Sequence, residues 1–222
     1  MPNKEIALRL MTGLESQDCL GNNLRLNSGC LLALSWLSSP EMNPAHWLFD
    51  KLYPLIRFVY ERIQKHAWFD KVTPQLWLGG APTYDRDYEF IKNAGITAVL
   101  NIRAERDDDQ EFYRQSGIDY LRLEVLDVMV PPPEEIEEGV AFIDKHVQEG
   151  DVVLVHCAKG RGRSATLLAA YLMRHGHMSY DEANGLLLSK RSLVNLQGRH
   201  QRILEAWNSG QNTRTDPSLT AD

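Results

Sequence analysis

Four apolar residues in a row, Val152 to Val155, lead into a turn that holds two glycines. A strand that alternates apolar and polar residues can leave one face in water, but a strand that is apolar at every position must be buried on both faces. Such strands lie in the middle of parallel sheets, where helices cover the two faces. The segment 151–156 is therefore predicted to be a central strand of an α/β fold.

The segments around this run alternate between strand-like and helix-like patterns. Strands are expected at 75–78, 96–102, 120–125 and 151–156, and helices at 83–94, 108–116, 131–150, 164–175, 179–190 and 198–207. Strands that alternate with helices favour parallel pairing, with the helices packed on both faces of the sheet. The sequence thus predicts a central, mainly parallel sheet flanked by helices, a three-layer sandwich with a helical C-terminal tail.

The chain divides into four parts by its pattern. Residues 1–41 have no helical or strand period, so we expect a loosely ordered extension, and 209–222 are expected to be a disordered tail. An amphipathic helical segment at 42–69, kinked at Pro54, precedes a main domain at 70–208. With its aromatic and basic residues, 46–65 could make a peripheral contact with a membrane, but such a helix more often packs on its own domain, and we expect packing.

Composition excludes several classes of protein. The 222 residues include 24 Lys and Arg against 30 Asp and Glu, a net charge of −6, which argues against nucleic acid as a partner. The three cysteines show no CxxC or metal-ligand spacing, so neither a disulfide or zinc scaffold nor any metal or cofactor is expected. No apolar stretch is long enough to span a bilayer, and we expect a cytoplasmic location. The sequence does not indicate an oligomeric state.

The turn after the central strand carries the chemistry. It runs from His156 to Ser164, with Cys157 at its start, Arg163 at its end and a predicted helix behind it. Backbone amides in such a turn and the positive end of the helix form an anion site, and glycines allow a phosphate to come close. The same field stabilises a thiolate, and a guanidinium can hold two phosphate oxygens. The turn therefore predicts a cysteine nucleophile within a phosphate site.

The motif His-Cys-x-x-Gly-x-x-Arg-Ser at 156–164 resembles the signature of cysteine-dependent protein tyrosine and dual-specificity phosphatases. The resemblance covers about residues 70–207 and implies a phosphatase with a cysteinyl-phosphate intermediate. It gives Cys157 the role of nucleophile and Arg163 that of phosphate clamp, while Ser164 helps the cysteine to leave and His156 supports the loop. The residues expected to bind phosphate are Ala158, Lys159, Gly160, Arg161 and Gly162. A rhodanese-type loop and an incidental glycine-rich turn are weaker alternatives.

Cleavage of a phosphate ester also needs an acid that protonates the leaving oxygen. The family supplies an aspartate about thirty residues before the cysteine, and Asp127 stands in that position, after the third predicted strand. We expect Asp127 to be the general acid, with Glu124 as the runner-up. The acidic run Asp107 to Asp109 is expected to be a solvated helix start. Gln201 is a weaker candidate for placing the hydrolytic water.

Substrate class is less determined than mechanism. The family acts on phosphorylated proteins and on anionic, phosphate-bearing small molecules or lipids, and Lys159 and Arg161 could meet a second phosphate. Similarity to mitochondrial-type phosphatidylglycerophosphate phosphatases extends over the strand, the loop and the following helix. However, Asn101 to Arg106 replaces their acidic loop and resembles small atypical dual-specificity members. An active phosphatase remains the main interpretation, and a phosphate-binding module without turnover is the alternative of another class.

Overall fold

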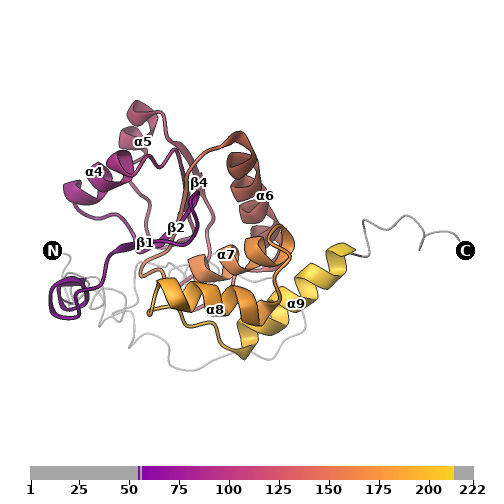
Figure 1. The fold of residues 1–222 in the computed structure, drawn as a ribbon. Coiled ribbons are helices and arrows are strands. Elements are labelled where there is room, and N and C mark those ends of the chain that lie inside the picture. Colours follow the sequence, from indigo (N-terminus) through magenta and orange to yellow (C-terminus); the bar gives the residue numbers. More distant parts are fainter. Residues whose placement is uncertain (1–54, 56, 213–222) are drawn as a thin grey trace, which may run out of the picture. The chain divides into compact units, whose positions relative to one another are not determined.

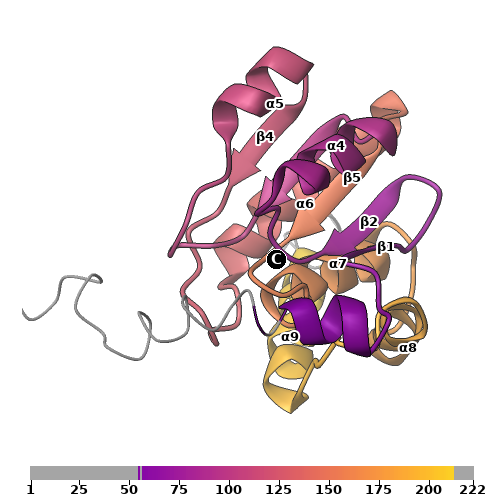
Figure 2. The same cartoon turned by 90° about the vertical axis from the view of Figure 1, so that its left-hand side faces the viewer.

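The buried run at the centre of the predicted sheet is strand β5 (Val153–His156) in the computed structural model, which describes residue 55 and residues 57–212. All four residues of β5 are buried. The strand lies between β2 (Leu76–Gly79) and β3 (Ala98–Asn101) and is parallel to both, and β4 (Asp119–Arg122) extends the sheet beside β3. The strand order is β1-β2-β5-β3-β4, which Figure 2 shows from β1 on one side to β4 on the other. The prediction of a mainly parallel sheet is confirmed.

One strand was not predicted. β1 (Phe69–Lys71) pairs antiparallel with β2, and Phe69 lies opposite Gly79. The two strands are joined by a tight turn in which the Thr73 hydroxyl accepts hydrogen bonds from the amides of Gln75 and Leu76. Three residues are too few to show a strand period, so only the neighbouring strand selects this conformation.

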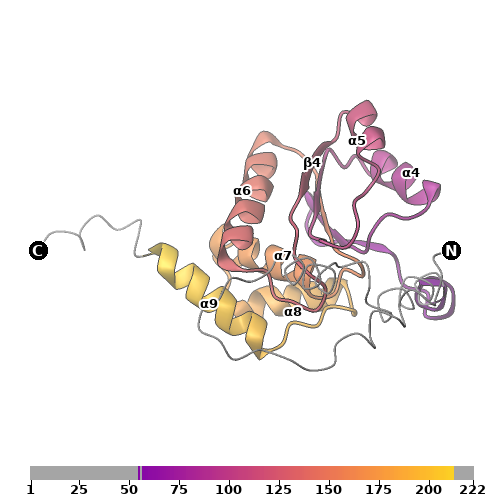
Figure 3. The ribbon, with the colours of Figure 1, turned by 180° about the vertical axis from the view of Figure 1, so that it is seen from behind.

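The two faces of the sheet are covered by different helices (Figures 1 and 3). α4 (Asp85–Asn93) and α5 (Gln110–Ser116) lie on one face, where Ile91 and Tyr113 pack with Leu154 of β5. The other face carries α6 (Pro133–Glu149), α7 (Arg163–Arg174), α8 (Tyr180–Lys190) and α9 (Gly198–Asn212). Alternate residues of β5 therefore serve two cores, as the uninterrupted apolar run requires.

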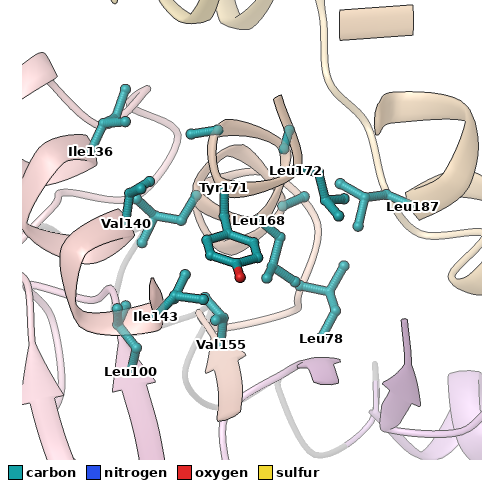
Figure 4. Packing of buried hydrophobic residues seen from close by; sticks show 14 of the residues in the cluster. Leu78, Leu100, Ile136, Val140, Ile143, Val155, Leu168, Tyr171, Leu172 and Leu187 are labelled. Carbon is teal, nitrogen blue, oxygen red and sulfur yellow. The ribbon is translucent and has the colours of Figure 1, made fainter. Parts of the chain in front are cut away.

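Helix α7 is the centre of the larger core. Every residue from Arg163 to Met173 is buried. Figure 4 shows Leu168 and Tyr171 of this helix between Val140 and Ile143 of α6 on one side and Leu187 of α8 on the other. The loop that begins the helix is thus attached to the most buried element of the domain.

Several helix ends follow the sequence signals. Pro133 starts α6, and Gly150 ends it with a left-handed φ of 90°. The predicted capping box of α8 is present, with Ser179 and Glu182 exchanging hydrogen bonds. α9 continues to Asn212, so the expected domain end at 208 falls inside this helix. The extension 1–41, Pro54 and the tail beyond 212 lie outside the described residues.

The described part of the amphipathic segment packs on the domain. It includes a π-helical turn at Val59–Ile63. The buried Arg57 donates to both carboxylate oxygens of Asp87 at 2.5 and 2.6 Å, and its guanidinium lies 4.4 Å from the ring centre of Trp68. Leu55, Phe58 and Ile63 remain exposed. Among the residues that the structure describes, no helix combines the length and apolar character needed to cross a membrane.

Candidate active site

The glycine-rich turn forms a loop, Cys157 to Gly162, between β5 and α7. Gly160 adopts a left-handed φ of 64°. A Cβ at this position would lie 2.5 Å from the carbonyl oxygen of Gly79 and 2.8 Å from Nε of Arg191. Both the backbone conformation and the space therefore require glycine at 160.

Behind the loop stands Arg191, which directly follows α8 and is buried. Its Nε donates to the carbonyl of Gly160 at 3.0 Å and its Nη2 to that of Lys159 at 2.9 Å. Its Nη1 donates to Asp70 at 2.5 Å and to the carbonyl of Ala67 at 3.3 Å. This arginine joins the loop to the segment around β1, and sequence reasoning missed it.

The carbonyl contacts of Arg191 determine where the loop amides point. In a trans peptide, the carbonyl of one residue and the N–H of the next point in opposite directions. With the carbonyls of Lys159 and Gly160 turned toward Arg191, the amides of Gly160 and Arg161 point the other way. The Arg161 amide interacts with the Cys157 sulfur accordingly. The loop is therefore oriented to present N–H groups on the side of Cys157.

The thiol of Cys157 is almost fully buried at the start of the loop. The Ser164 hydroxyl donates to its sulfur across 3.3 Å. Burial alone raises the pKa of the Cys157 thiol, but the charge of Arg163 and the hydroxyl and amide of Ser164 outweigh it, so the pKa is lowered. The predicted proximity of Cys157, Arg163 and Ser164 is present in the structure.

Arg163 is the first residue of α7 and is held by carboxylates. Its Nη1 and Nη2 donate to Glu105 at 2.7 and 2.8 Å, a two-pronged pair. Nη1 also donates to the carbonyl of Val125 at 2.8 Å, and Nη2 donates to Asp127 at 2.9 Å. All four hydrogen atoms on Nη1 and Nη2 are donated to these acceptors, which leaves the hydrogen atom on Nε for a further acceptor. Burial raises the pKa of Glu105, but its bonds to Arg163 lower it overall.

Glu105 was not predicted, although it shares Arg163 with Asp127. It follows β3, the neighbour of β5, at the edge of the sheet where parallel strands end. In open α/β sheets this edge is where sites form. The position of Glu105 indicates a site residue only once the strand order is known.

A cavity of about 280 Å³ lies in front of the loop. Its lining comprises Asp127, Val128, Met129, Cys157, Ala158, Lys159, Arg161, Gly162, Arg163, Asn195, Gln197, Arg199 and His200. The expected phosphate-binding residues Ala158, Lys159, Arg161 and Gly162 thus line the cavity, while Gly160 lies between Gly79 and Arg191. The residues from 195 to 200 were not predicted as part of the site.

The two candidates for the general acid, Asp127 and Glu124, differ in their surroundings. Asp127 lines the cavity and is part-exposed, whereas the Glu124 side chain is 68 % exposed and pairs with Arg122. Val128, next to Asp127, has a φ of 60°, an unfavourable conformation for a β-branched residue. Gln201 donates to Glu205 and is not part of the cavity lining.

His156 and the acidic run form a buried network. His156 Nε2 lies 2.7 Å from Asp108, which also accepts from Arg103 at 2.6 Å and from the Tyr113 hydroxyl at 3.1 Å. The expectation that the run is solvated was wrong for Asp108, whose side chain has no exposure. Burial raises the pKa of Asp108, but His156 and Arg103 lower it overall. His156 thus connects the end of β5 to the start of α5.

One group of described residues could hold a metal ion. The ligand atoms of His146, Glu149 and Asp151 lie within 4.8 Å of one another. His146 Nδ1 is already 2.7 Å from Asp151. Asp151 precedes β5 whereas Cys157 follows it, so this group lies at the other end of the strand from the loop. It takes no part in the arrangement around Cys157.

Comparison with known proteins gives this geometry a family. Residues 76–210 match the sequence profile described as "Dual specificity phosphatase, catalytic domain". The chain belongs to the dual specificity phosphatase family. The matched range contains the loop, Glu105, Asp127, Arg191 and the start of α9. The chain is accordingly a phosphatase with an α/β fold of the dual-specificity type.

Individual relatives of this phosphatase fall into two groups. The human "Phosphatidylglycerophosphatase and protein-tyrosine phosphatase 1" is 26% identical over 160 residues, 69% of this chain and 80% of the relative. Rat "Dual specificity protein phosphatase 26" is 33% identical over 172 residues, 75% of this chain and 80% of the relative. The crystal structure of PTPMT1 in complex with PI(5)P has a TM-score of 0.62 at 24% identity and covers 68% of this chain and 100% of its own, which shows a shared fold.

Proposed function

We propose that this phosphatase hydrolyses phosphate monoesters through a cysteinyl-phosphate on Cys157, with Arg163 as the clamp and Asp127 as the general acid. The observation that carries the proposal is a buried thiol whose pKa is lowered by Arg163 and Ser164 within a loop of inward-facing amides. A thiolate in an anion site can attack the phosphorus of a bound phosphate.

In the first step, the Cys157 sulfur forms a bond to phosphorus while the bond from phosphorus to the ester oxygen breaks. The loop amides and Arg163 stabilise the charge on the three remaining phosphate oxygens. Asp127 gives its proton to the leaving oxygen, so the product departs as an alcohol. The electron pair of the broken bond stays on that oxygen.

Arg163 must change partners during this step. To hold the phosphate through Nε and Nη2, Arg163 must exchange Asp127 for a phosphate oxygen at Nη2. The second hydrogen atom of Nη2 is already donated to Glu105. The exchange releases Asp127 from its ion pair, and the released carboxyl group can then carry the proton. Glu105 keeps the guanidinium in place meanwhile.

In the second step, a water molecule attacks the phosphocysteine. The new bond forms between the water oxygen and phosphorus, the phosphorus–sulfur bond breaks, and Asp127 takes the proton from the water. The Ser164 hydroxyl, 3.3 Å from the sulfur, donates a hydrogen bond to the departing thiolate. Inorganic phosphate leaves and the thiolate is restored.

The nucleophile is tested with Cys157→Ser and an activated aryl phosphate. We expect turnover to be abolished while phosphate binding and the fold persist, because a serine hydroxyl is not deprotonated by the loop as a thiol is. Cys19→Ser is the matched control and should keep its activity, and EDTA should leave the parent active. Turnover by Cys157→Ser at the parent rate would remove the covalent mechanism.

The substrate class follows less directly. The similarity to a dual specificity protein phosphatase supports phosphorylated proteins as substrates. A phospholipid or inositol phosphate is the second candidate, favoured by the similarity to a phosphatidylglycerophosphatase and by the basic residues Lys159, Arg161 and Arg199 along the cavity. The exposed Leu55, Phe58 and Ile63 suit a cytoplasmic enzyme that touches a membrane through this segment. A module without turnover is disfavoured because Cys157, Arg163 and Asp127 converge in one cavity.

A further inference from the structure

Acidic side chains lie around one buried histidine at the edge of the sheet where the parallel strands begin. β4 starts at Asp119, and Asp151 lies two residues before β5. His146, in the last turn of α6, lies 3.5 Å from the first carboxylate and 2.7 Å from the second. Glu149 ends the same helix. Cys157 follows β5, so this group is separate from the catalytic loop.

Three of these side chains have the spacing of ligands to one metal ion. The ligand atoms of His146, Glu149 and Asp151 all lie within 4.8 Å of one another. Nδ1 of the histidine is 2.7 Å from Asp151 Oδ2 and 4.0 Å from Glu149 Oε2. Metal–ligand bonds of about 2.1 Å in tetrahedral geometry place two ligand atoms about 3.4 Å apart. The two observed separations lie on either side of this value, and Glu149 is 55% exposed, so its side chain can turn toward the ring.

The ring of His146 supplies a second, independent observation. It is 2% exposed, and its Nε2 has no hydrogen-bond partner among the described residues. If Nδ1 donates its hydrogen to Asp151, the buried lone pair of Nε2 lies 3.5 Å from a carboxylate oxygen of Asp119, which is also an acceptor. Such an unpaired acceptor is costly. A metal ion on Nδ1 would leave the ring hydrogen on Nε2, where Asp119 can accept it, as carboxylates do behind metal-bound histidines.

The surroundings of the group favour a cation. The Thr97 hydroxyl donates to Oδ1 of Asp151 at 2.8 Å, which fixes this carboxylate with Oδ2 toward the histidine. The C-terminal end of α6 adds a partial negative charge at the same place. Lys145 lies 3.7 Å from Asp119 and is 58% exposed, so it offsets only part of this charge. Three carboxylates against this lysine leave the group negative.

We infer that His146, Glu149 and Asp151 bind a divalent transition-metal ion, with Asp119 as the acceptor behind the histidine. One imidazole nitrogen and two carboxylate oxygens suit Zn²⁺, whereas Mg²⁺ and Ca²⁺ prefer oxygen ligands alone. A water molecule would complete the tetrahedron. The ion would connect the end of α6 to the start of β5 and stabilise the fold, without a part in phosphate hydrolysis. The set contains no cysteine, so the cysteine spacing carried no sign of it.

Calorimetry with Zn²⁺ tests the inference in the Cys157→Ser variant, which lacks the catalytic thiolate as a competing ligand. Loss of an outer partner of a metal-bound histidine costs about ten- to a hundredfold in affinity. We therefore expect Asp119→Ala to weaken Zn²⁺ binding about tenfold and Glu149→Ala, which removes a ligand, about a hundredfold. Glu138→Ala is the matched control, since Glu138 is an exposed carboxylate on the same helix outside the group, and it should leave the affinity unchanged.

Denaturant unfolding gives a second readout. Zn²⁺ at about a hundred times its Kd should lower the unfolding equilibrium constant of the Cys157→Ser protein about a hundredfold. At the same Zn²⁺ concentration, His146→Gln should show no such stabilisation. Glu149→Ala changes an exposed side chain, so it keeps the test valid even where the buried histidine cannot be replaced without unfolding the domain. It should lose most of the stabilisation.

The contrary results are equally specific. No saturable Zn²⁺ binding, or the same affinity in Glu149→Ala and Glu138→Ala, would overturn the site. Equal affinity for Mg²⁺ would show that carboxylates alone attract the ion and would overturn the role of His146. Unchanged affinity in Asp119→Ala would contradict the hydrogen bond from Nε2 to that carboxylate. These measurements need no turnover, so they stand apart from the test of the covalent mechanism.

Discussion

Two buried arginines hold the loop from opposite sides, and they differ in what they bind. Arg163 contacts the carboxylates of Glu105 and Asp127 and a single carbonyl. Arg191 contacts three carbonyls and the carboxylate of Asp70. A carboxylate can be exchanged for a phosphate, whereas a loop carbonyl cannot leave without refolding the loop. Arg163 can thus exchange a partner during the reaction, whereas Arg191 maintains the conformation of the loop.

The largest effect is expected for Arg163→Lys. Lysine keeps the charge but lacks the planar fork that follows phosphate oxygens into the transition state. We expect kcat/KM to fall on the order of 10³-fold, within the range known for the loss of a transition-state donor, with little loss of stability. Steady-state kinetics and thermal unfolding measured together check this. A large stability loss with mild kinetics would reverse the distinction between the two arginines.

The next largest effect is expected for Asp127→Asn, which removes the proton donor but keeps the shape. With alkyl phosphates, kcat/KM should fall on the order of 10²-fold, since a poor leaving group needs general-acid help. Activated aryl phosphates should lose much less. A leaving-group series measures the difference. If alkyl and aryl substrates lost equally, Asp127 would not be the donor and Glu124 would be examined next.

Compared with these two substitutions, Arg191→Lys is expected to lower kcat/KM less and the free energy of unfolding more. Lysine cannot reach the carbonyls of Lys159 and Gly160 with two separate donors while keeping Asp70. We expect the free energy of unfolding to drop by about 1.5 to 3 kcal/mol, the range for hydrogen bonds to a charged group. Denaturant unfolding checks the value. An unchanged stability with lost activity would place Arg191 in the reaction instead.

The smallest loss of kcat/KM is expected for Asp70→Asn, which changes the carboxylate partner of Arg191. Glu105→Gln is the matched variant, since it changes the carboxylate partner of Arg163. Asp70 touches neither the thiol nor the phosphate site, so its variant should keep the pH midpoint of Cys157 alkylation. That midpoint lies below the ordinary thiol value of about 8.5 because the pKa is lowered, so alkylation slows only as the pH falls through the lowered pKa.

Glu105→Gln, by contrast, should lower kcat/KM about tenfold, because the guanidinium loses its two-pronged carboxylate partner. Rates with one aryl phosphate compare the two variants directly. Equal losses in both would show that the two sides of the loop are energetically linked.

The sequence predicted the elements that are local in the chain. A buried strand, a glycine turn and a helix lie within 151–175, so their pattern alone located Cys157 and Arg163 together. Asp127 was located by its distance from the cysteine, through a family resemblance. In contrast, Glu105 lies 58 residues from Arg163, and their contact depends on β3 lying beside β5. Pattern reasoning does not give strand order, so such partners were not predicted.

Two further misses have the same origin. Asp108 was expected in water because charged runs usually start helices at the surface. Its burial arises from Arg103 in the same connection and from His156, which the sheet brings to it from the end of β5. Arg191 lies in an ordinary polar stretch after a helix, and only the packing of α8 behind the loop gives it a function. Contacts that tertiary structure creates leave no period in the sequence.

The burial of α7 from Arg163 to Met173 has a consequence for hydrogen exchange. Amides within a helix buried from Arg163 to Met173 should exchange only when the whole domain unfolds. The loop around Asp127 is different, since Leu126, Val128 and Met129 are exposed and Val128 has an unfavourable φ. Its amides should exchange through local opening. The boundary between global and local exchange therefore passes between Arg163 and Asp127, whose side chains lie 2.9 Å apart, and the proton donor can move while the cation stays fixed.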